Sequence, residues 1–323
     1  MGPPEKEPLH FPPFCTPGNG AAPKDMKFQV VCDSSADLPR NFAQENRVTV
    51  VPYYISLDDQ TYLREGVDLS IPDLYQAMID RGDCFPKTSM PTITDYMEAF
   101  LPHVKAGLPV LCICLTRKFS GSIQSAMNAR SAILEDYPQA QIHVMDSQLV
   151  TALEGLLVKE ALRLRDRDLT MEEAVSLLEP IRSSGRIFFT TRDLKYLEHG
   201  GRLSKAASMA GSLLNLKPIL CFHDGELDAT EICRGRKKSL QKVVDNFFRY
   251  LQEHQMDLKG YQFGTGIGVE LPEYPKFIAE LEQRFRDTGI QPDEWFKVQI
   301  GATIGVHTGP YPMGLGILKK CDI

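Results

Sequence analysis

The sequence predicts an α/β protein with two domains. In the first half, short apolar runs with strand character alternate with amphipathic helical segments, which is typical of a parallel sheet covered by helices. In the second half, Asp224-Gly225 separates two strand-like runs and indicates a hairpin, so we expect a mixed sheet there. The 323 residues, of which 43% are apolar and 24% charged, are sufficient to build two cores.

The N-terminal α/β domain is predicted to span residues 26–155. Residues 1–25 precede it, contain seven prolines with little apolar periodicity, and are interpreted as a flexible tail or an added extension. Helices are expected from Ser70, from Asp95 with Glu98 as a capping pair, and over residues 122–135. Apolar runs predict strands at residues 28–32, 48–54, 110–115 and 141–145.

The C-terminal α/β domain is predicted at residues 156–323, after a boundary region between Leu149 and Arg167. One helix carries apolar residues from Val150 to Leu164, and Thr170 with Glu173 caps another. A long helix is expected over residues 237–254. Strands are predicted at residues 186–190, 219–222, 261–269 and 296–300.

Composition excludes several classes of function. A net charge of −6 and a pI of about 5.7 argue against a nucleic-acid partner, because phosphate binding needs a clustered basic surface. The basic run at residues 234–238 is local and suits an acidic protein partner or a phosphate. No apolar stretch reaches the roughly 18 residues of a membrane span, so no transmembrane segment is expected. The eight cysteines lack metal-site or disulfide spacing, which predicts no metal and a reducing cytoplasm.

The segment from Tyr196 to Leu220 is dominated by small and apolar residues. Gly200 and Gly201 are expected to end a short helix with a positive φ, and Arg202 projects from that turn. The small side chains that follow, including Ala206 and Ala210, let a large group lie close to the backbone. The segment is therefore either tightly packed core or one wall of a narrow apolar tunnel.

Hydroxyl groups follow several predicted strands of the first half. They occur in Asp33-Ser34-Ser35, in the run from Thr116 to Ser122, and in Asp146-Ser147. The carboxyl ends of parallel strands bind ligands, and Ser120-Gly121-Ser122 would open a helix whose free N–H groups favour an anion. Ordinary helix caps and turns explain these serines equally well.

Two further segments carry polar candidates. Residues 87–92 are predicted to form a polar loop that brings more hydroxyls to the same edge. In residues 300–310, His307 lies between glycine-bearing turns, which indicates a position at a wall or a mouth. The usual catalytic motifs are missing, including the P-loop, H-E-x-x-H and G-x-S-x-G, and Gly264-Thr265-Gly266-Ile267-Gly268 lacks dinucleotide-binding spacing. These absences favour a binding module over an enzyme.

Several short motifs occur in order between Met26 and the end of the chain. In the first half they are Cys32-Asp33-Ser34-Ser35-Ala36-Asp37-Leu38-Pro39, Thr88-Ser89-Met90-Pro91-Thr92, Phe119-Ser120-Gly121-Ser122 and Met145-Asp146-Ser147. In the second half they are Leu197-Glu198-His199-Gly200-Gly201-Arg202-Leu203-Ser204, Leu216-Lys217-Pro218-Ile219-Leu220, Arg234-Gly235-Arg236-Lys237-Lys238 and His307-Thr308-Gly309-Pro310. Together they resemble the DegV family of bacterial fatty-acid-binding proteins, including the FakB-type subunits of the fatty acid kinase system.

The resemblance implies two α/β domains with a ligand tunnel between or within them, holding one long-chain fatty acid and no other cofactor. Residues implied to bind the carboxylate are Thr88, Ser89, Thr116, Ser120, Gly121, His307 and Thr308. Residues implied to line the acyl tunnel are Ala206, Met209, Ala210, Leu213, Leu214 and Ile219. The chain departs from the family pattern at Met90, where glutamine is usual, and near Arg117, where serine is usual.

The resemblance also implies that catalysis is performed elsewhere. A separate ATP-dependent kinase would phosphorylate the bound acid, and an acyltransferase would use the acyl phosphate. The residues implied to dock the kinase are Arg202, Arg234, Arg236 and Lys237. Two alternatives remain open: a stand-alone enzyme that uses His307 as phosphoryl acceptor or general base, and a regulator that only senses lipid.

Overall fold

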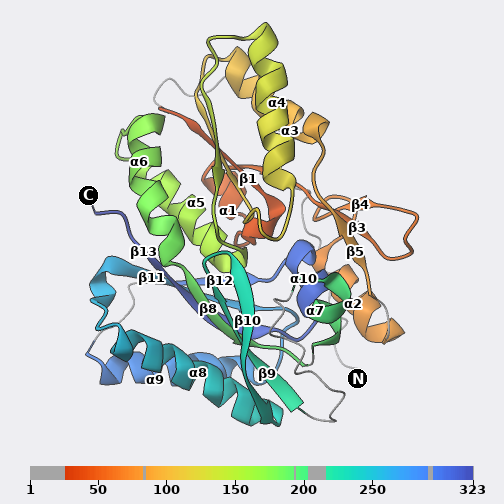
Figure 1. The fold of residues 1–323 in the computed structure, drawn as a ribbon, viewed down its shortest axis with the longest axis vertical. Coiled ribbons are helices and arrows are strands. Elements are labelled where there is room, and N and C mark those ends of the chain that lie inside the picture. Colours follow the sequence, from red (N-terminus) through yellow and green to blue (C-terminus); the bar gives the residue numbers. More distant parts are fainter. Residues whose placement is uncertain (1–25, 83–84, 193, 203–215, 290–293, 323) are drawn as a thin grey trace, which may run out of the picture.

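Helices cover two separate sheets, which confirms the predicted α/β architecture of a parallel sheet and a mixed sheet (Figure 1). The computed structural model describes residues 26–82, 85–192, 194–202, 216–289 and 294–322. A third, small sheet of three strands lies beside the N-terminal part.

The N-terminal sheet has the strand order β2-β1-β6-β7, with every neighbouring pair parallel. Its strands are β1 (Gln29–Asp33), β2 (Thr49–Val51), β6 (Val110–Cys114) and β7 (Ile142–Asp146). All five residues of β6 are buried, as expected for a strand covered on both faces. Helices α3 (Ile93–Lys105) and α4 (Ser122–Asp136) pack on one face, and α5 (Thr151–Arg165) packs on the other.

Two sequence predictions in this half were wrong in detail. The single strand predicted at residues 48–54 is two strands, β2 in the main sheet and β3 in the small sheet, because Pro52 lies between them and cannot donate to a ladder. The predicted loop at residues 87–92 begins with strand β5. The small sheet has the order β4-β3-β5 and consists of β3 (Tyr54–Ser56), β4 (Leu63–Arg64) and β5 (Lys87–Ser89).

Helix caps explain where several helices begin. Ser70 caps α2 (Ile71–Arg81) by accepting from the Asp73 backbone N–H, as predicted. For α3 the predicted pair was wrong: Thr92 is the cap, and Asp95 occupies the third helical position of a reciprocal capping box. Thr170 and Glu173 form the predicted box before α6 (Met171–Ile181).

The C-terminal sheet has the order β10-β9-β8-β13-β11-β12, with every neighbouring pair antiparallel except β11 and β12. The predicted hairpin joins β9 to β10, and Asp224 and Gly225 have φ values of 50° and 77°, as a type I′ turn requires. The six strands are β8 (Arg186–Thr190), β9 (Leu216–His223), β10 (Glu226–Arg234), β11 (Tyr261–Ile267), β12 (Trp295–Gln299) and β13 (Met313–Lys319). The sequence analysis did not identify β13, which lies in the middle of this sheet.

Long helices cover one face of the C-terminal sheet. They are α8 (Arg236–Glu253), near the predicted range, and α9 (Tyr274–Asp287), which was not predicted. Phe247, Phe263 and Phe285 pack together at this layer in edge-to-face and tilted pairs, with ring centroids 4.9–6.4 Å apart. The other face of the sheet is left for contacts with α5 and the N-terminal loops.

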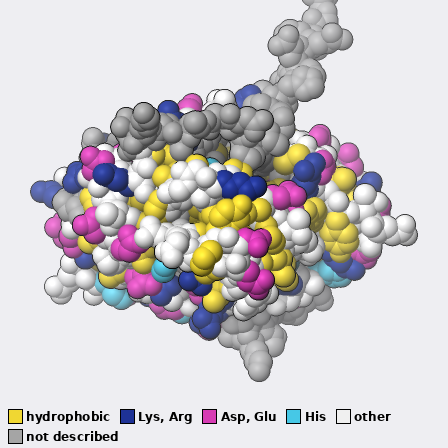
Figure 2. All heavy atoms as spheres, turned by 90° about the horizontal axis from the view of Figure 1, so that it is seen from above, with side chains coloured by type: hydrophobic (Ala, Val, Ile, Leu, Met, Phe, Trp, Pro, Cys, Tyr) yellow, Lys and Arg dark blue, Asp and Glu magenta, His cyan; other side chains and the backbone are white. Residues whose placement is uncertain are grey.

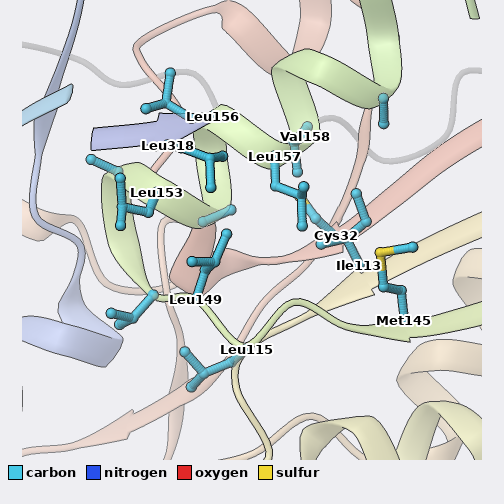
Figure 3. Close-up of a cluster of buried hydrophobic side chains, with 14 of the residues drawn as sticks. Cys32, Ile113, Leu115, Met145, Leu149, Leu153, Leu156, Leu157, Val158 and Leu318 are labelled. Carbon is cyan, nitrogen blue, oxygen red and sulfur yellow. The ribbon is translucent and has the colours of Figure 1, made fainter. Parts of the chain in front are cut away.

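Helix α5 joins the two sheets. Leu153 and Leu156 belong to a core cluster that also holds Ile113 of β6 and Leu318 of β13 (Figure 3). Almost every residue of α5 is buried, because both of its sides meet a sheet. The predicted domain boundary at residue 155 falls within this helix and stays a prediction.

Three short helices complete the described chain: α1 (Phe42–Glu45), α7 (Lys195–Gly200) and α10 (Ala302–Thr308). Gly201 ends α7 with a φ of 64°, as predicted from the sequence. The prediction of glycine-bearing turns around His307 was wrong, because residues 302–308 are helical. Gly305 lies in that helix against the Tyr75 ring, where a side chain would overlap the phenol oxygen.

Candidate ligand-binding cavity

A cavity of about 410 Å³ lies between the N-terminal loops and the face of the C-terminal sheet that contacts α5. Its size falls in the range of small-molecule sites. Apolar side chains supply most of its wall: Leu115, Val150, Ile187, Phe189, Phe222 and Leu227. Polar side chains enter from the N-terminal loops and from α10. This combination suits a ligand that is largely apolar and has a polar group.

Four glycines form one wall of the cavity. Gly264 and Gly266 of β11 lie directly opposite Gly316 and Gly314 of β13. Because side chains alternate between the two faces of a strand, all four positions leave the same face bare. Leu315, between two of them, belongs to the core beneath α8 and α9. The sequence signal was the Gly-x-Gly spacing present in both strands: at Gly264 and Gly266 it was interpreted only as a failed dinucleotide motif, and at Gly314 and Gly316 it was not noticed.

Ser120 is oriented to donate a hydrogen bond into the cavity. Its Oγ accepts from the Tyr53 hydroxyl at 2.8 Å and from the Ser122 backbone N–H at 3.2 Å. With both acceptor positions of the oxygen engaged, the remaining proton is free to donate to a ligand. Tyr53 was not identified from the sequence, because it lies far from Ser120 along the chain and follows no motif.

Thr88 and His307 meet at the cavity although 219 residues separate them. The Thr88 Oγ1 lies 3.3 Å from His307 Nε2. The imidazole Nδ1 is buried without a hydrogen-bond partner among the described residues. Burial, and then the charge of Arg202, lower the pKa of His307 to about 4. At neutral pH the imidazole is therefore uncharged, with one N–H to donate.

The low pKa of His307 predicts a pH-dependent stability. An unfolded histidine titrates near pH 6.5, whereas folded His307 takes up a proton only near pH 4. Between these values the unfolded state binds more protons, so acidification favours unfolding. From pH 7.5 to pH 5, the free energy of unfolding should fall by about 2 kcal/mol through this group. Urea unfolding of the wild type and His307→Gln at both pH values measures the difference, and equal losses would contradict it.

Arg202 borders the cavity and connects two of its walls. Its Nη1 donates to the Gly200 carbonyl at 2.5 Å and its Nε to the Phe119 carbonyl at 3.4 Å. The side chain is otherwise exposed. Arg202 thus combines a structural contact with a positive charge next to the polar part of the cavity.

The other predicted docking residues lie at the junction of β10 and α8. Arg234 and Lys237 are exposed. Arg236 is only partly exposed, and its Nε lies 3.3 Å from Glu273 Oε1. Burial also lowers the pKa of its guanidinium, so Arg236 is less available to a protein partner than Arg234 or Lys237. On the face drawn in Figure 2, basic side chains are scattered among acidic and apolar ones.

The structure separates the predicted carboxylate residues into two groups. Thr88, Ser120, Gly121, His307 and Thr308 line the cavity. Ser89 and Thr116 do not line it: Ser89 is exposed beside Thr88 on β5, where neighbouring residues face opposite ways, and the buried Thr116 accepts a hydrogen bond from the Lys118 N–H.

Most residues predicted to line the tunnel lie outside the described part of the chain: Ala206, Met209, Ala210, Leu213 and Leu214. Ile219 is described and does not line the cavity. It belongs to the core beneath α8, whereas Phe222, three residues later on β9, lines the cavity. The alternation of strand side chains places the two residues on opposite faces of the sheet. Residues that the sequence analysis missed include Tyr53, Thr303, Phe189 and Phe222.

The described part of the chain contains neither a membrane-spanning helix nor a metal-binding cluster. No helix there is long and apolar enough to cross a membrane. No group of three or more histidine, cysteine, aspartate or glutamate side chains there is arranged to hold a metal ion.

Comparison with known proteins assigns the chain to a family. The profile of the DegV family, described as uncharacterised proteins, matches residues 27–320. The chain belongs to the DegV family. A DegV domain-containing protein of Caldanaerobacter subterraneus subsp. tengcongensis is 32% identical to it over 294 residues, which cover 91% of this chain and 99% of the relative.

Solved structures of similar DegV proteins extend this comparison. A stearic acid-binding protein from Eubacterium ventriosum is 38% identical, with a TM-score of 0.85 over 91% of this chain and 98% of the other. A fatty-acid-binding DegV protein from Thermus thermophilus is 27% identical, with a TM-score of 0.79 over 91% and 100%. DegV from Bacillus subtilis, a fatty acid binding protein, is 26% identical, with a TM-score of 0.76 over 91% and 100%. Fatty acid binding thus recurs among the relatives of this DegV protein.

Proposed function

We propose that this DegV protein is a carrier that binds one long-chain fatty acid in the cavity and presents its carboxyl group to a separate ATP-dependent kinase. The observation that carries the proposal is the combination, in one cavity, of an apolar wall with the Thr88, Ser120 and His307 donors. The fatty-acid-binding relatives support it. The role is that of a FakB-type subunit in the cytoplasm, where ATP is available.

Burial of the acyl chain would dominate affinity. A tail of about fifteen methylenes contributes roughly 12 kcal/mol at ~0.8 kcal/mol each, before the costs of ordering reduce the total. The absence of side chains at Gly264, Gly266, Gly314 and Gly316 leaves more room at the cavity wall, although Ala152 and Leu153 of α5 pack closely against Gly264 and Gly316.

The polar part of the cavity suits a carboxylate that must react afterwards. A buried carboxylate needs donors, and Ser120, Thr88 and the uncharged His307 can supply them without a tight ion pair. Hydroxyl donors leave a carboxylate oxygen nucleophilic. In the proposed transfer, that oxygen attacks the γ-phosphorus of ATP on the kinase, the bond from this phosphorus to ADP breaks, and an acyl phosphate forms for an acyltransferase.

Mass spectrometry of an organic extract of the purified protein tests the binding role directly. We expect about one fatty acid per chain, and rebinding of added fatty acid after delipidation. Protein that is purified empty and refuses added fatty acid would contradict the proposal. Incubation with ATP and a cognate kinase then tests presentation, because a lipid sensor would bind the acid without yielding acyl phosphate, and a stand-alone enzyme would turn over without the kinase.

Loss of single donors should weaken binding. Ser120→Ala and His307→Ala are each expected to lower fatty acid affinity roughly tenfold or more, because each removes a hydrogen bond to a charged group. Titration calorimetry of delipidated protein measures the affinities. Ser89→Ala is the matched control, since Ser89 adjoins Thr88 but lies outside the cavity. Equal affinities for all three variants and the wild type would show that other residues hold the carboxylate.

A further inference from the structure

One buried carboxylate holds both ends of the loop that carries Ser120. The Asp33 Oδ2 accepts from the Leu115 backbone N–H at 3.1 Å and from the Ser122 Oγ at 3.1 Å. Leu115 and Ser122 are the first and last residues of this segment, which we call the ligand loop (residues 115–122). Asp33 has no exposed surface, so its carboxylate contacts the ligand loop from the protein interior. The position of Ser120 therefore depends on Asp33.

A second buried carboxyl group is connected to Asp33 through one hydroxyl. The Ser35 Oγ lies 2.5 Å from Asp33 Oδ1 and 2.8 Å from Glu154 Oε2. A serine hydroxyl has one proton and can donate to only one of these oxygens. The other contact requires a proton on the carboxyl group. One of the two acids is therefore neutral if both contacts are hydrogen bonds.

The surroundings identify Glu154 as the neutral acid. Asp33 receives four donors: the Ser35 N–H and O–H, the Leu115 N–H and the Ser122 O–H. Among the described residues, Glu154 forms a hydrogen bond with Ser35 only, and its Oε1 is buried there without a hydrogen-bond partner. A buried carboxylate with so few donors is far costlier than a buried acid.

The titratable groups near Glu154 favour the same assignment. Burial, and then the charge of Asp33, raise the pKa of Glu154 well above its ordinary value. Cys114 of β6 and Asp37, which follows the turn after β1, raise this pKa further. Burial raises the pKa values of three further groups near Glu154, and an ionised Glu154 would raise them more: Cys32 of β1, Cys112 of β6 and the Tyr53 phenol.

We propose that Asp33 is the positioning residue of the ligand loop, and that Glu154 is a neutral acid that donates to Ser35, which in turn donates to the Asp33 carboxylate. The effect on fatty acid affinity rests on the proposed function, whereas the protonation of Glu154 does not. We call this series of hydrogen bonds, from Glu154 through Ser35 to Asp33, the relay. It leaves the two acids with a single negative charge, which lies on Asp33, the residue that holds the ligand loop.

The direction of the relay makes sharp predictions for isosteric variants. In Glu154→Gln the amide N–H replaces the acid O–H, so the order of donors is unchanged. In Asp33→Asn the amide N–H can donate to Ser35, whose hydroxyl then donates to an ionised Glu154, so the relay reverses. In the double variant, both amides donate to Ser35, and the serine proton has no acceptor. Glu154→Gln is therefore tolerated, whereas Asp33→Asn carries the cost of ionising Glu154 and of removing the acceptor of the Ser35 N–H. The double variant carries the further cost of a serine proton that no group accepts.

Infrared difference spectroscopy and a double-mutant cycle test the relay without any ligand. At neutral pH, the wild type should show one carbonyl stretch of a protonated carboxylic acid that disappears in Glu154→Gln, whatever band the buried Asp37 contributes to both proteins. Urea unfolding should show that the double variant loses at least tenfold more in its folding constant than the two singles predict together. A double variant that fails to fold beside two folded singles is the extreme form of this result. A missing infrared band or additive effects would overturn the relay.

Fatty acid affinity tests the positioning role separately. Asp33→Ala removes the acceptor for Leu115 and Ser122, and should weaken binding at least tenfold. Asp33→Asn should restore affinity to within about threefold of the wild type, because the amide oxygen still accepts from the loop. Equal weakening by both would overturn the positioning role. If the wild type bound no fatty acid at all, the proposed function would fail, while the infrared band and the cycle would still decide the relay.

Discussion

Among glycine-to-alanine substitutions near the cavity, Gly200→Ala is expected to cause the largest loss of fatty acid affinity. A Cβ at this position would overlap His307 Nδ1 and lie 3.0 Å from Cε1. The imidazole must then shift, which disturbs its alignment with Thr88 at the polar part of the cavity. Such overpacking typically costs 1–3 kcal/mol of stability. Calorimetric titration should show at least a tenfold loss of affinity, and urea unfolding should show the loss of stability.

Gly201→Ala is the matched control for this change. Gly201 has a φ of 64°, so alanine is strained there, but nothing lies within 4 Å of the added Cβ. The strain should cost about 1 kcal/mol of stability and leave His307 in place. Affinity should therefore fall only in Gly200→Ala. If both variants lost affinity equally, the contact between Gly200 and His307 would not be the cause.

Gly314→Ala is expected to cause the largest loss of stability. The added Cβ would overlap the Phe189 Cβ and lie 2.5 Å from the Phe188 carbonyl oxygen, and backbone atoms in the centre of a sheet cannot yield easily. We expect a decrease of about 3 kcal/mol in the free energy of unfolding. Urea unfolding measures this, with circular dichroism to confirm that the fold persists.

A glycine on the neighbouring strand provides the comparison. Gly266→Ala places its Cβ 3.2 Å from Cγ1 and 3.4 Å from Cδ1 of Ile300, side-chain atoms that can shift more easily than backbone. Its stability loss should stay below about 1 kcal/mol. Because Gly266 also lines the cavity, this variant should still narrow the space for an acyl chain and weaken binding. A stability loss equal to that of Gly314→Ala would mean that close backbone contact is not the decisive factor.

The sequence predicted elements best where one strong pattern decides them. Strand β6 was predictable because Val110 to Cys114 is an unbroken buried apolar run, and the hairpin because Asp224-Gly225 suits positive φ values. Strand β13 and helix α10 were missed for a shared reason. Gly314 and Gly316 interrupt the apolar pattern of the strand, and Gly301 and Gly305 obscure that of the helix. Glycines placed for tertiary contacts lower the local signal that sequence analysis reads.

The site was predictable in its chemistry but not in its geometry. Hydroxyls after strands and His307 near the C-terminus were identified from residue type and motif. The choice between Thr88 and Ser89, and between Ile219 and Phe222, was not available from the sequence. Adjacent or nearby strand residues point to opposite faces, and which face meets the cavity depends on partner strands elsewhere in the chain.

By itself, the sequence determined the alternation of strands and helices, the two kinds of sheet and the chemical groups available to a ligand, because apolar period and turn chemistry are local properties. Only the tertiary structure decided that Tyr53 orients Ser120, that Gly200 makes room for His307 and that four glycines of two strands share one bare face. These relations join residues that are about 50 to 110 positions apart, and they arise from packing and strand register, which no local pattern encodes.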